Sequence, residues 1–264
     1  MKNFSWDTTQ YNKFSQQRMR PALDLLKVVS VYLEDPQTIW DLGCGTGNIT
    51  AHLAQKWPQS TVLGIDSSSD MLASCYKDFG NIPTIKWKKH NLESWDPANN
   101  KADLIFSNAV FQWLPNHEIL INRFLKKINE GGCIAVQIPN NWNSPSHTFA
   151  VDVLSSSNLL TSEIEKIVRS KRIESQEFYY DLLSPHASHV DIWTTEYLHI
   201  LEGDDPVFEW IQGTSLRPIL ESLQFSERNS FLEACRRRLG TLYPKTVDGN
   251  TLYTFRRMFF VAFF

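Results

Sequence analysis

The chain has 264 residues, 42% of them hydrophobic, and a formal net charge of −3 spread over both halves, which fits a globular protein of one large or two small domains. It has no long charge run of one sign that would mark nucleic acid or a membrane surface as a partner, and its longest apolar run, 258–264, is too short to cross a bilayer. Four scattered cysteines without a CxxC pair, and an N-terminus without a signal-peptide pattern, lead us to expect a cytoplasmic protein without structural disulfides.

Helical and strand patterns alternate along the first half of the chain. Apolar positions at helical spacing over 21–33 predict a first helix, before the first strand. The strands predicted next are 38–42, 61–66, 85–91, 102–108 and 133–139. Helices are predicted between them over 48–57, 67–79 and from about Glu118 to Ile128, followed by a turn at Gly131 and Gly132. This alternation predicts an α/β fold with a parallel sheet, right-handed crossovers and helices on both faces.

After Pro139 the regular alternation ends. Residues 147–172 have a polar helical pattern, and a helix ending near Leu183 precedes a run rich in β-branched and aromatic residues at 190–201. Two more helical patterns lie around 206–212 and 226–239, and 252–264 is a last strand. We expect a single domain over 1–264, with helical insertions at about 143–185 and 204–240 that form a lid over the substrate.

Glycine occupies every second position after the first predicted strand, at Gly43, Gly45 and Gly47. A phosphate-binding P-loop would need a closing Lys-Ser or Lys-Thr, which is absent, and a dinucleotide fingerprint would need GxGxxG rather than GxGxG. A turn without a ligand stays possible. The pattern favours a third interpretation, a loop for S-adenosylmethionine, because Asp41 before the glycines can hold the ammonium group of that molecule.

Polar residues also end the next strands, at the edge of the sheet where ligands bind in open α/β folds. Asp66 ends the second strand, where an acid typically binds ribose hydroxyls. The Asn91 amide, after the third strand, can face the adenine amino group, although a plain loop asparagine is the alternative. Asn108 ends the fourth strand, beside the expected position of the donor methyl group. With their neighbours Ser67 and Leu92, these residues complete the predicted cofactor site.

Several segments resemble those of class I S-adenosylmethionine-dependent methyltransferases: DLGCGTG (41–47), GID (64–66) and LIFSNAVFQWLPNH (104–117). Other segments narrow the resemblance to the trans-aconitate 2-methyltransferase subfamily and extend it nearly end to end: FSQQRMRPA (14–22), AVQIPNNW (135–142), Tyr179–Asp181, VDIW (190–193) and GTSLRPIL (213–220). The sequence departs from the pattern at Asn91 and Asn140, where acids are usual, and over 155–175.

This resemblance implies a Rossmann-like, seven-stranded, mostly parallel sheet whose last strand is antiparallel. It also implies S-adenosyl-L-methionine as cofactor and methyl transfer to a carboxylate of a small polycarboxylic acid, trans-aconitate in that subfamily. Because a carboxylate is ionised at neutral pH, an in-line displacement on the sulfonium methyl needs no general base. We therefore predict no catalytic base, and no metal site.

Such an acceptor has further carboxylates that the site must hold, and arginine binds carboxylates with two parallel hydrogen bonds. We predict that Arg18 and Arg217 do so; Arg20 cannot share a helical face with Arg18, so at most one of that pair points inward. Gln112, Trp113 and Tyr180 are the other residues predicted to position the acceptor. Of the Tyr179–Tyr180 pair one is expected in the core, and His117 is expected to cap a helix rather than act as a base.

Two alternatives remain open at this level. The same chemistry could act on a malonyl thioester of acyl carrier protein, which would require a basic docking surface for an acidic partner. A regulatory protein could instead bind S-adenosylmethionine without catalysis, and would lack an inner acceptor pocket. For the leading hypothesis we expect a monomer whose partner is a small molecule.

Overall fold

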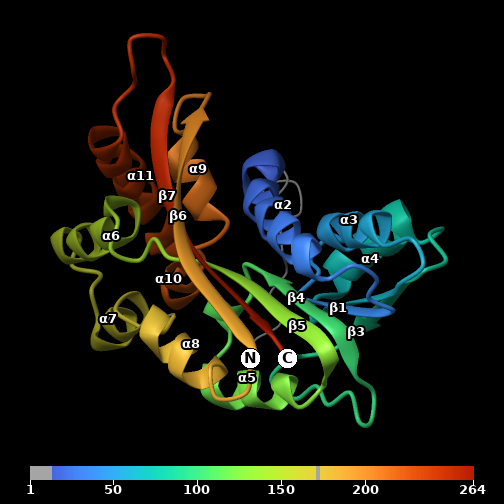
Figure 1. Cartoon of the computed structure of the whole chain (residues 1–264). Coiled ribbons are helices and arrows are strands. Elements are labelled where there is room, and N and C mark those ends of the chain that lie inside the picture. The colour runs from blue at the N-terminus through green and yellow to red at the C-terminus, as the bar shows by residue number, and fades with distance from the viewer. Residues whose placement is uncertain (1–13, 171–172) are drawn as a thin grey trace.

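A computed structural model describes residues 14–170 and 173–264 of the chain (Figure 1). In this part of the chain a seven-stranded sheet has the order β3-β2-β1-β4-β5-β7-β6. Its strands are β1 (Thr38–Leu42), β2 (Thr61–Asp66), β3 (Ile85–Lys89), β4 (Ala102–Asn108), β5 (Ile128–Pro139), β6 (His189–Leu201) and β7 (Thr251–Phe263). The first five strands pair in parallel, and β7 lies antiparallel between β5 and β6. The predicted seven-stranded, mostly parallel sheet with an antiparallel last strand is confirmed.

Helices connect the strands and cover both faces of the sheet (Figure 1). Their bounds are α2 (Ser15–Tyr32), α3 (Asn48–Lys56), α4 (Ser69–Phe79), α5 (His117–Leu125), α6 (Pro145–Ser156), α7 (Ser162–Val168), α8 (Gln176–Leu183), α9 (Pro206–Gln212), α10 (Arg217–Ser222) and α11 (Phe225–Leu242), with a 3₁₀ turn, η1 (Phe111–Trp113). Apolar residues of α2 and α3 pack on one face, and those of α5 and α8 on the other.

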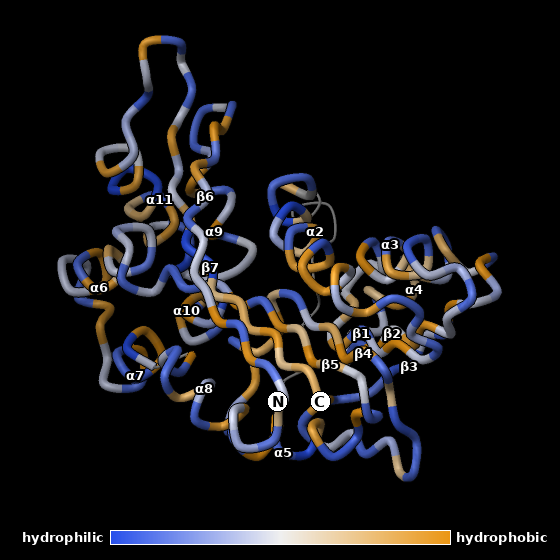
Figure 2. The backbone as a smooth tube through the Cα atoms, viewed as in Figure 1, coloured by the Kyte–Doolittle hydropathy of each residue, from blue (hydrophilic) through white to orange (hydrophobic). Residues whose placement is uncertain are grey.

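The alternation of side chains along β4 shows how both faces are filled. Leu104 and Phe106 point into the core under α2 and α3, whereas Ile105 points into the core under α5. All three side chains are fully buried, as expected for a strand of a parallel sheet that is covered on both faces. In Figure 2 the apolar colour accordingly gathers along the central strands, and the polar colour lies on outer helices and loop tips.

Several predicted boundaries are wrong. Helix α2 begins at Ser15 rather than at 21, and β3 ends at Lys89 rather than at 91. The boundary between α5 and β5 is also wrong. The helix expected to reach Ile128 ends at Leu125, and β5 begins at Ile128, so that Gly131 and Gly132 lie inside the strand rather than in a turn before it. The register between β4 and β5 shifts between Ala102 and Leu104, which marks an irregularity in the pairing. Gly131 has a φ of +77° there, and glycine accepts this backbone conformation without steric cost.

The two helical segments after β5 and β6 build a second core. Helices α6, α9 and α11 pack against the first half of β7, around the buried side chains of Trp210, Phe231, Tyr253 and Phe255. Figure 1 shows that β6 and β7 extend beyond the other strands and hold these helices beside the sheet. Of the helices in the described residues, none combines the length and apolar character that crossing a membrane requires.

Candidate active site

The turn after β1 owes its shape to its glycines. Gly43, Gly45 and Gly47 all have positive φ, at +73°, +56° and +84°. A Cβ atom on Gly43 would lie 2.2 Å from a methyl group of Val110, and one on Gly47 would lie 2.7 Å from the ring of Trp87. A Cβ on Gly45 would meet nothing within 4 Å. Gly43 and Gly47 therefore let the turn pack against the sheet, whereas Gly45 borders open space.

Asp66, at the end of β2, fixes this turn. Its Oδ2 accepts a hydrogen bond from the Gly45 amide at 2.9 Å, and its Oδ1 accepts one from the Ser68 amide at 2.8 Å. Burial raises the pKa of Asp66, and these backbone hydrogen bonds oppose the rise. The Ser67 amide is a third backbone donor to this carboxylate. A carboxylate has about four acceptor positions, so a position beyond these is open to a ligand. Ser67, also predicted for the site, is exposed next to it.

Asp41, one strand away, is almost completely buried, with 2% of its surface exposed. Its Oδ2 accepts a hydrogen bond from the Thr50 hydroxyl at 2.6 Å. Burial raises the pKa of Asp41 to about 7, the hydrogen bond from Thr50 lowers it, and the negative charge of Asp66 raises it further. A cation placed beside this carboxyl group would stabilise its ionised form.

A cleft with about 560 Å³ of empty space, open to solvent at its mouth, lies in front of the turn. The cleft joins the glycine turn to the end of β4 and to the start of α2. Its lining includes Arg18, Met19, Asp41, Gly43, Cys44, Gly45, Thr46, Asn48, Ile49 and Asn108. The structure thus brings together Asp41, Gly43, Gly45 and Asn108 of the predicted cofactor residues, with the predicted acceptor residue Arg18.

The residues predicted at the end of β3 have local roles. Asn91 is exposed, and its side chain accepts a hydrogen bond from the Glu93 amide at 3.0 Å, which makes it a turn residue in this structure. Leu92 is buried in the core beneath α5, in the same cluster as Trp95. The alternative of a plain loop asparagine therefore describes the observed geometry of Asn91.

Two amide side chains, one at the end of β4 and one in η1, have oxygen atoms without a hydrogen-bond partner. The buried Oδ1 of Asn108 makes no hydrogen bond. Gln112, in η1, is buried and donates from Nε2 to the Ala109 carbonyl at 2.7 Å, while its Oε1 has no partner. Trp113, the last residue of η1, is half-buried. A buried acceptor without a donor costs free energy, so both oxygens are positions that a bound molecule could satisfy.

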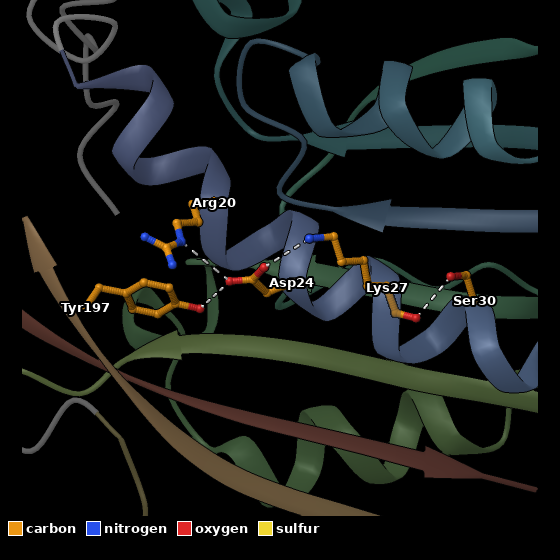
Figure 3. Close-up of polar contacts among 5 residues, drawn as sticks. All are labelled: Arg20, Asp24, Lys27, Ser30 and Tyr197. Atoms are coloured by element: carbon orange, nitrogen blue, oxygen red, sulfur yellow. Dashed lines mark hydrogen bonds and ion pairs between the residues drawn. The ribbon is translucent and has the colours of Figure 1, made fainter.

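The arginines of α2 point to different places. The guanidinium of Arg18 lies 5.1 Å from the Trp210 ring, and its Nη2 donates to the Trp210 carbonyl at 3.3 Å. Arg20 instead lies 3.9 Å from Asp24, which also accepts a hydrogen bond from Tyr197 (Figure 3). Since Arg18 borders the cleft and 69% of the Arg20 side chain is exposed, Arg18 is the one that faces inward.

The other predicted acceptor residues lie on the inserted helices. Arg217 begins α10, and its Nε is 3.3 Å from a carboxylate oxygen of Glu221. Tyr180, on α8, is 53% exposed, whereas its neighbour Tyr179 is fully buried. The expectation that one tyrosine of this pair belongs to the core therefore matches the structure.

His117 holds three segments together. It is the first residue of α5 and is buried. Its Nε2 is 2.8 Å from the Phe111 carbonyl, so that nitrogen is the donor, and its Nδ1 then accepts from the Tyr179 hydroxyl at 2.6 Å. Both ring nitrogens of His117 are thus engaged in hydrogen bonds, and Asn116 rather than His117 is the residue that precedes the helix.

Sequence reasoning missed a buried cation on β7. Arg257 is only 3% exposed and donates from Nη1 to the Oε1 of Gln137 on β5 at 3.3 Å. The signal was present in 251–263, because every second residue from Tyr253 onward forms one apolar face that Arg257 alone interrupts. A charged side chain on a buried strand face is costly unless it has a hydrogen-bonding partner, so such a residue points to a pairing or a binding function.

Comparison with known proteins agrees with this arrangement. Residues 39–132 match the family described as "Methyltransferase domain". The chain is 39% identical over 258 residues to a trans-aconitate 2-methyltransferase of Azoarcus sp. (strain BH72), covering 98% of each chain. It is 38% identical to a protein of the same name from Rhodopseudomonas palustris (strain BisB18), covering 97% of this chain and 98% of the relative.

Solved structures are similar at the level of the fold. Phosphoethanolamine N-methyltransferase 2 of Haemonchus contortus, in complex with phosphomonomethylethanolamine and S-adenosylhomocysteine, superposes with a TM-score of 0.56 at 14% identity, over 97% of this chain and 58% of that one. The plantazolicin methyltransferase BpumL gives a TM-score of 0.52 at 16% identity, over 97% and 89% of the two chains. At such identities these likenesses describe the fold alone.

Proposed function

Because the chain belongs to the trans-aconitate 2-methyltransferase family, we propose that it methylates a carboxylate of trans-aconitate, with S-adenosyl-L-methionine as the methyl donor. The observation that carries this proposal is the similarity over nearly the full length, which includes the inserted helices as well as the glycine turn. The two alternatives, a malonyl carrier as acceptor and a regulatory protein without catalysis, are not favoured by relatives of this name.

The residues of the cleft fit the cofactor. The ionised Asp41 pairs with the ammonium group, and the open acceptor position of Asp66 binds a ribose hydroxyl. Gly45 leaves room for the ligand against the backbone, and the unpartnered Oδ1 of Asn108 is a further acceptor in the cleft. S-adenosylmethionine supplies an electrophilic methyl group on a positively charged sulfur.

No residue of the chain has to remove a proton in this reaction, because the acceptor carboxylate is ionised at neutral pH. What the chain supplies is position: it holds the attacking oxygen in line and keeps the other carboxylates fixed. Arg18 is suited to this because it borders the cleft beside Asp41. We retain Gln112, Trp113, Tyr180 and Arg217 as further positioning residues. Exclusion of water favours the reaction of an anion with a cation, since charge disappears as the bond forms.

The segments 143–185 and 204–240 form the lid over the acceptor in this proposal. Their helices pack on the long β6–β7 pair beside the sheet, and Trp210 of α9 contacts Arg18. We also propose that the enzyme is a monomer and acts in the cytoplasm. Light scattering of the purified protein tests the first of these, and cell fractionation the second.

The test of function is a transfer assay with methyl-labelled S-adenosylmethionine. Purified protein is offered trans-aconitate, cis-aconitate, isocitrate, a malonyl carrier protein, or no acceptor. We expect label on trans-aconitate, with a higher kcat/KM than for the other acids. Label on the malonyl carrier alone would overturn the proposal, as would tight cofactor binding without transfer to any acceptor.

A further inference from the structure

We propose that Gln137 and Arg257 form a subsite that holds one carboxylate of the acceptor that is not methylated. This inference rests on the proposed function for the identity of the acceptor. The subsite lies on the sheet itself, on β5 and β7, and none of the residues predicted from the sequence belongs to it.

The orientation of the Gln137 amide is the first step. A guanidinium can only donate hydrogen bonds, so the Gln137 oxygen must be the atom that faces Arg257 Nη1, at 3.3 Å. The amide nitrogen then points away from Arg257. That nitrogen is buried and has no hydrogen-bond partner, in a residue with no exposed surface. Arg257 thus fixes a buried N–H donor that lacks an acceptor, which is costly unless a ligand supplies one.

The subsite is next to the cofactor cleft. Gln137 is the register partner of Asn108 in the parallel pairing of β4 and β5, so their side chains leave the same face about 4.8 Å apart along the hydrogen-bonding direction. Asn108 lines the cleft. A molecule that reaches past Asn108 therefore meets Gln137 on the next strand.

An aromatic cluster links the subsite to the other inward arginine. The Arg257 guanidinium lies 4.6 Å from the Phe255 ring, which is 5.6 Å from the Trp210 ring. Arg18 stacks on that same Trp210 at 5.1 Å. Arg18 and Arg257 therefore border one aromatic wall, from two different elements. Guanidinium groups at two places along one aromatic wall can each hold a different carboxylate of an acid that carries several.

The charges around the subsite favour an anion. His199 on β6 is 5% exposed, and its Nε2 has no hydrogen-bond partner. Burial and the positive charges of Arg257 and Arg20 lower the pKa of His199 to about 4, so it is neutral at pH 7 and can donate one N–H. The nearby carboxylate of Asp24 is engaged with Tyr197, Arg20 and Lys27 on α2 (Figure 3). A carboxylate is accordingly the ligand chemistry that these donors fit.

The test compares variants of the subsite with a matched control. Gln137→Glu replaces the free N–H by a negative oxygen, and we expect the KM for trans-aconitate to rise by about 100-fold, while the KM for S-adenosylmethionine changes by less than about threefold. Arg257→Lys keeps the positive charge but loses the planar pair of guanidinium donors, and we expect the KM for trans-aconitate to rise by about tenfold. Arg256→Gln is the control: Arg256 is the neighbour on the opposite face, exposed and paired with Glu196, and its kinetics should match the wild type.

Acids that lack one carboxyl group of trans-aconitate distinguish a binding role of Gln137 from a purely structural one. Mesaconate, glutaconate and itaconate are each trans-aconitate without one carboxyl group. The dicarboxylate without the methylated carboxyl group gives no kcat and is left out of the comparison. If Gln137 binds a carboxylate, the Gln137→Glu penalty in kcat/KM should nearly vanish for the one of the other two dicarboxylates that lacks that carboxylate, and persist for the remaining one. An equal penalty for every acid that is methylated, or equal rises in the KM of acceptor and cofactor, would overturn the subsite.

Failure of the proposed function can be recognised separately. Calorimetric titration of trans-aconitate into the protein saturated with S-adenosylhomocysteine measures binding without turnover. If the wild type binds the acid, and Gln137→Glu weakens that binding by about tenfold or more, the subsite stands even if no methyl transfer occurs. Unchanged binding in Gln137→Glu, with transfer intact in the wild type, would overturn the subsite and leave the function standing.

Discussion

The Asp66 carboxylate accepts a hydrogen bond from the Gly45 backbone amide at 2.9 Å, so the residue that ends β2 also fixes the turn that follows β1. The second oxygen of the same carboxylate accepts from the Ser68 amide at the start of α4. One side chain therefore connects the glycine turn of the cleft to the start of α4. Pre-organisation of this kind lowers the entropic cost of binding.

Replacing Asp66 by alanine should weaken cofactor binding more than it weakens the fold. We expect the Kd for S-adenosylhomocysteine to rise by about 100-fold, because both the turn and the acceptors for ribose are lost. The free energy of unfolding should fall by about 1–3 kcal/mol, since two part-buried amides lose their acceptor. Calorimetry and denaturant unfolding measure the two effects. Asp70→Ala, an exposed acid in the first turn of α4, is the control and should leave binding unchanged. If Asp66→Ala bound S-adenosylhomocysteine as tightly as the wild type, Asp66 would not belong to the cofactor site.

Replacing Gly43 or Gly45 by alanine should distinguish the role of the turn in packing, measured as stability, from its role in cofactor binding. In Gly43→Ala the new Cβ overlaps Val110 and the φ of +73° is strained, so we expect a loss of about 2–5 kcal/mol in stability. In Gly45→Ala the Cβ enters open space, so only the φ penalty of about 1 kcal/mol remains. Because Gly45 lines the cleft, its variant should nevertheless raise the cofactor KM by about tenfold.

A second substitution checks the cause of the Gly43 effect. The Gly43→Ala and Val110→Ala pair should recover part of the lost stability relative to Gly43→Ala alone, because the two methyl groups nearest the new Cβ are gone. Thermal unfolding of the four proteins of this cycle measures the recovery. An additive loss in the double variant would show that the overlap with Val110 is not what destabilises the turn.

Asp41 should make cofactor binding depend on pH. The pKa of Asp41 is raised to about 7, and binding of a cation requires the ionised form, so below pH 7 the protein must release a proton to bind. The affinity for S-adenosylhomocysteine should therefore rise with pH, by up to about tenfold per pH unit, and level off above pH 7. Calorimetry at several pH values tests this. Asp41→Asn should bind more weakly and without this dependence; an unchanged pH profile in Asp41→Asn would refute the role.

The same group affects the unliganded fold in the opposite sense. An acid whose pKa is higher in the folded than in the unfolded chain destabilises the fold as it ionises. The stability of the unliganded protein should consequently decrease between about pH 4 and about pH 7, the range between the two pKa values of Asp41. Denaturant unfolding without ligand should show a smaller decrease in Asp41→Asn than in the wild type.

The parts of this fold that follow from local pattern were predictable. Strands 38–42, 61–66 and 102–108 match the structure at both ends, because short apolar runs bounded by glycines, serines or asparagines leave little choice. The boundary between α5 and β5 was not predictable from local pattern. The start of β5 depends on the pairing of Ile128 with Ala102, which is a tertiary contact. Local sequence around Gly131 and Gly132 resembles a turn in any case.

The site, too, has residues that the sequence could predict and residues that depend on tertiary contacts. The glycine turn and Asp66 are adjacent to strand ends, so topology places the turn in the cleft and Asp66 directly behind it. Gln137 and Arg257 meet only because β7 inserts antiparallel between β5 and β6, with 120 residues between the two positions. The sequence also could not separate Arg18 from Arg20, since the choice depends on where Trp210 and Asp24 lie.

Without a catalytic base, kcat for trans-aconitate should not vary with pH between about pH 6.5 and about pH 9, at saturating cofactor, because carboxylates are ionised throughout that range. Two buried histidines fit this: burial lowers the pKa of His147, on α6, to about 4, and both ring nitrogens of His117, on α5, are engaged in hydrogen bonds. Tyr179→Phe, which removes the partner of His117, should cost about 1–2 kcal/mol in stability and leave kcat within about threefold of the wild type. A kcat that falls below a pKa near 7, and loses that dependence in His117→Gln, would instead identify His117 as a base.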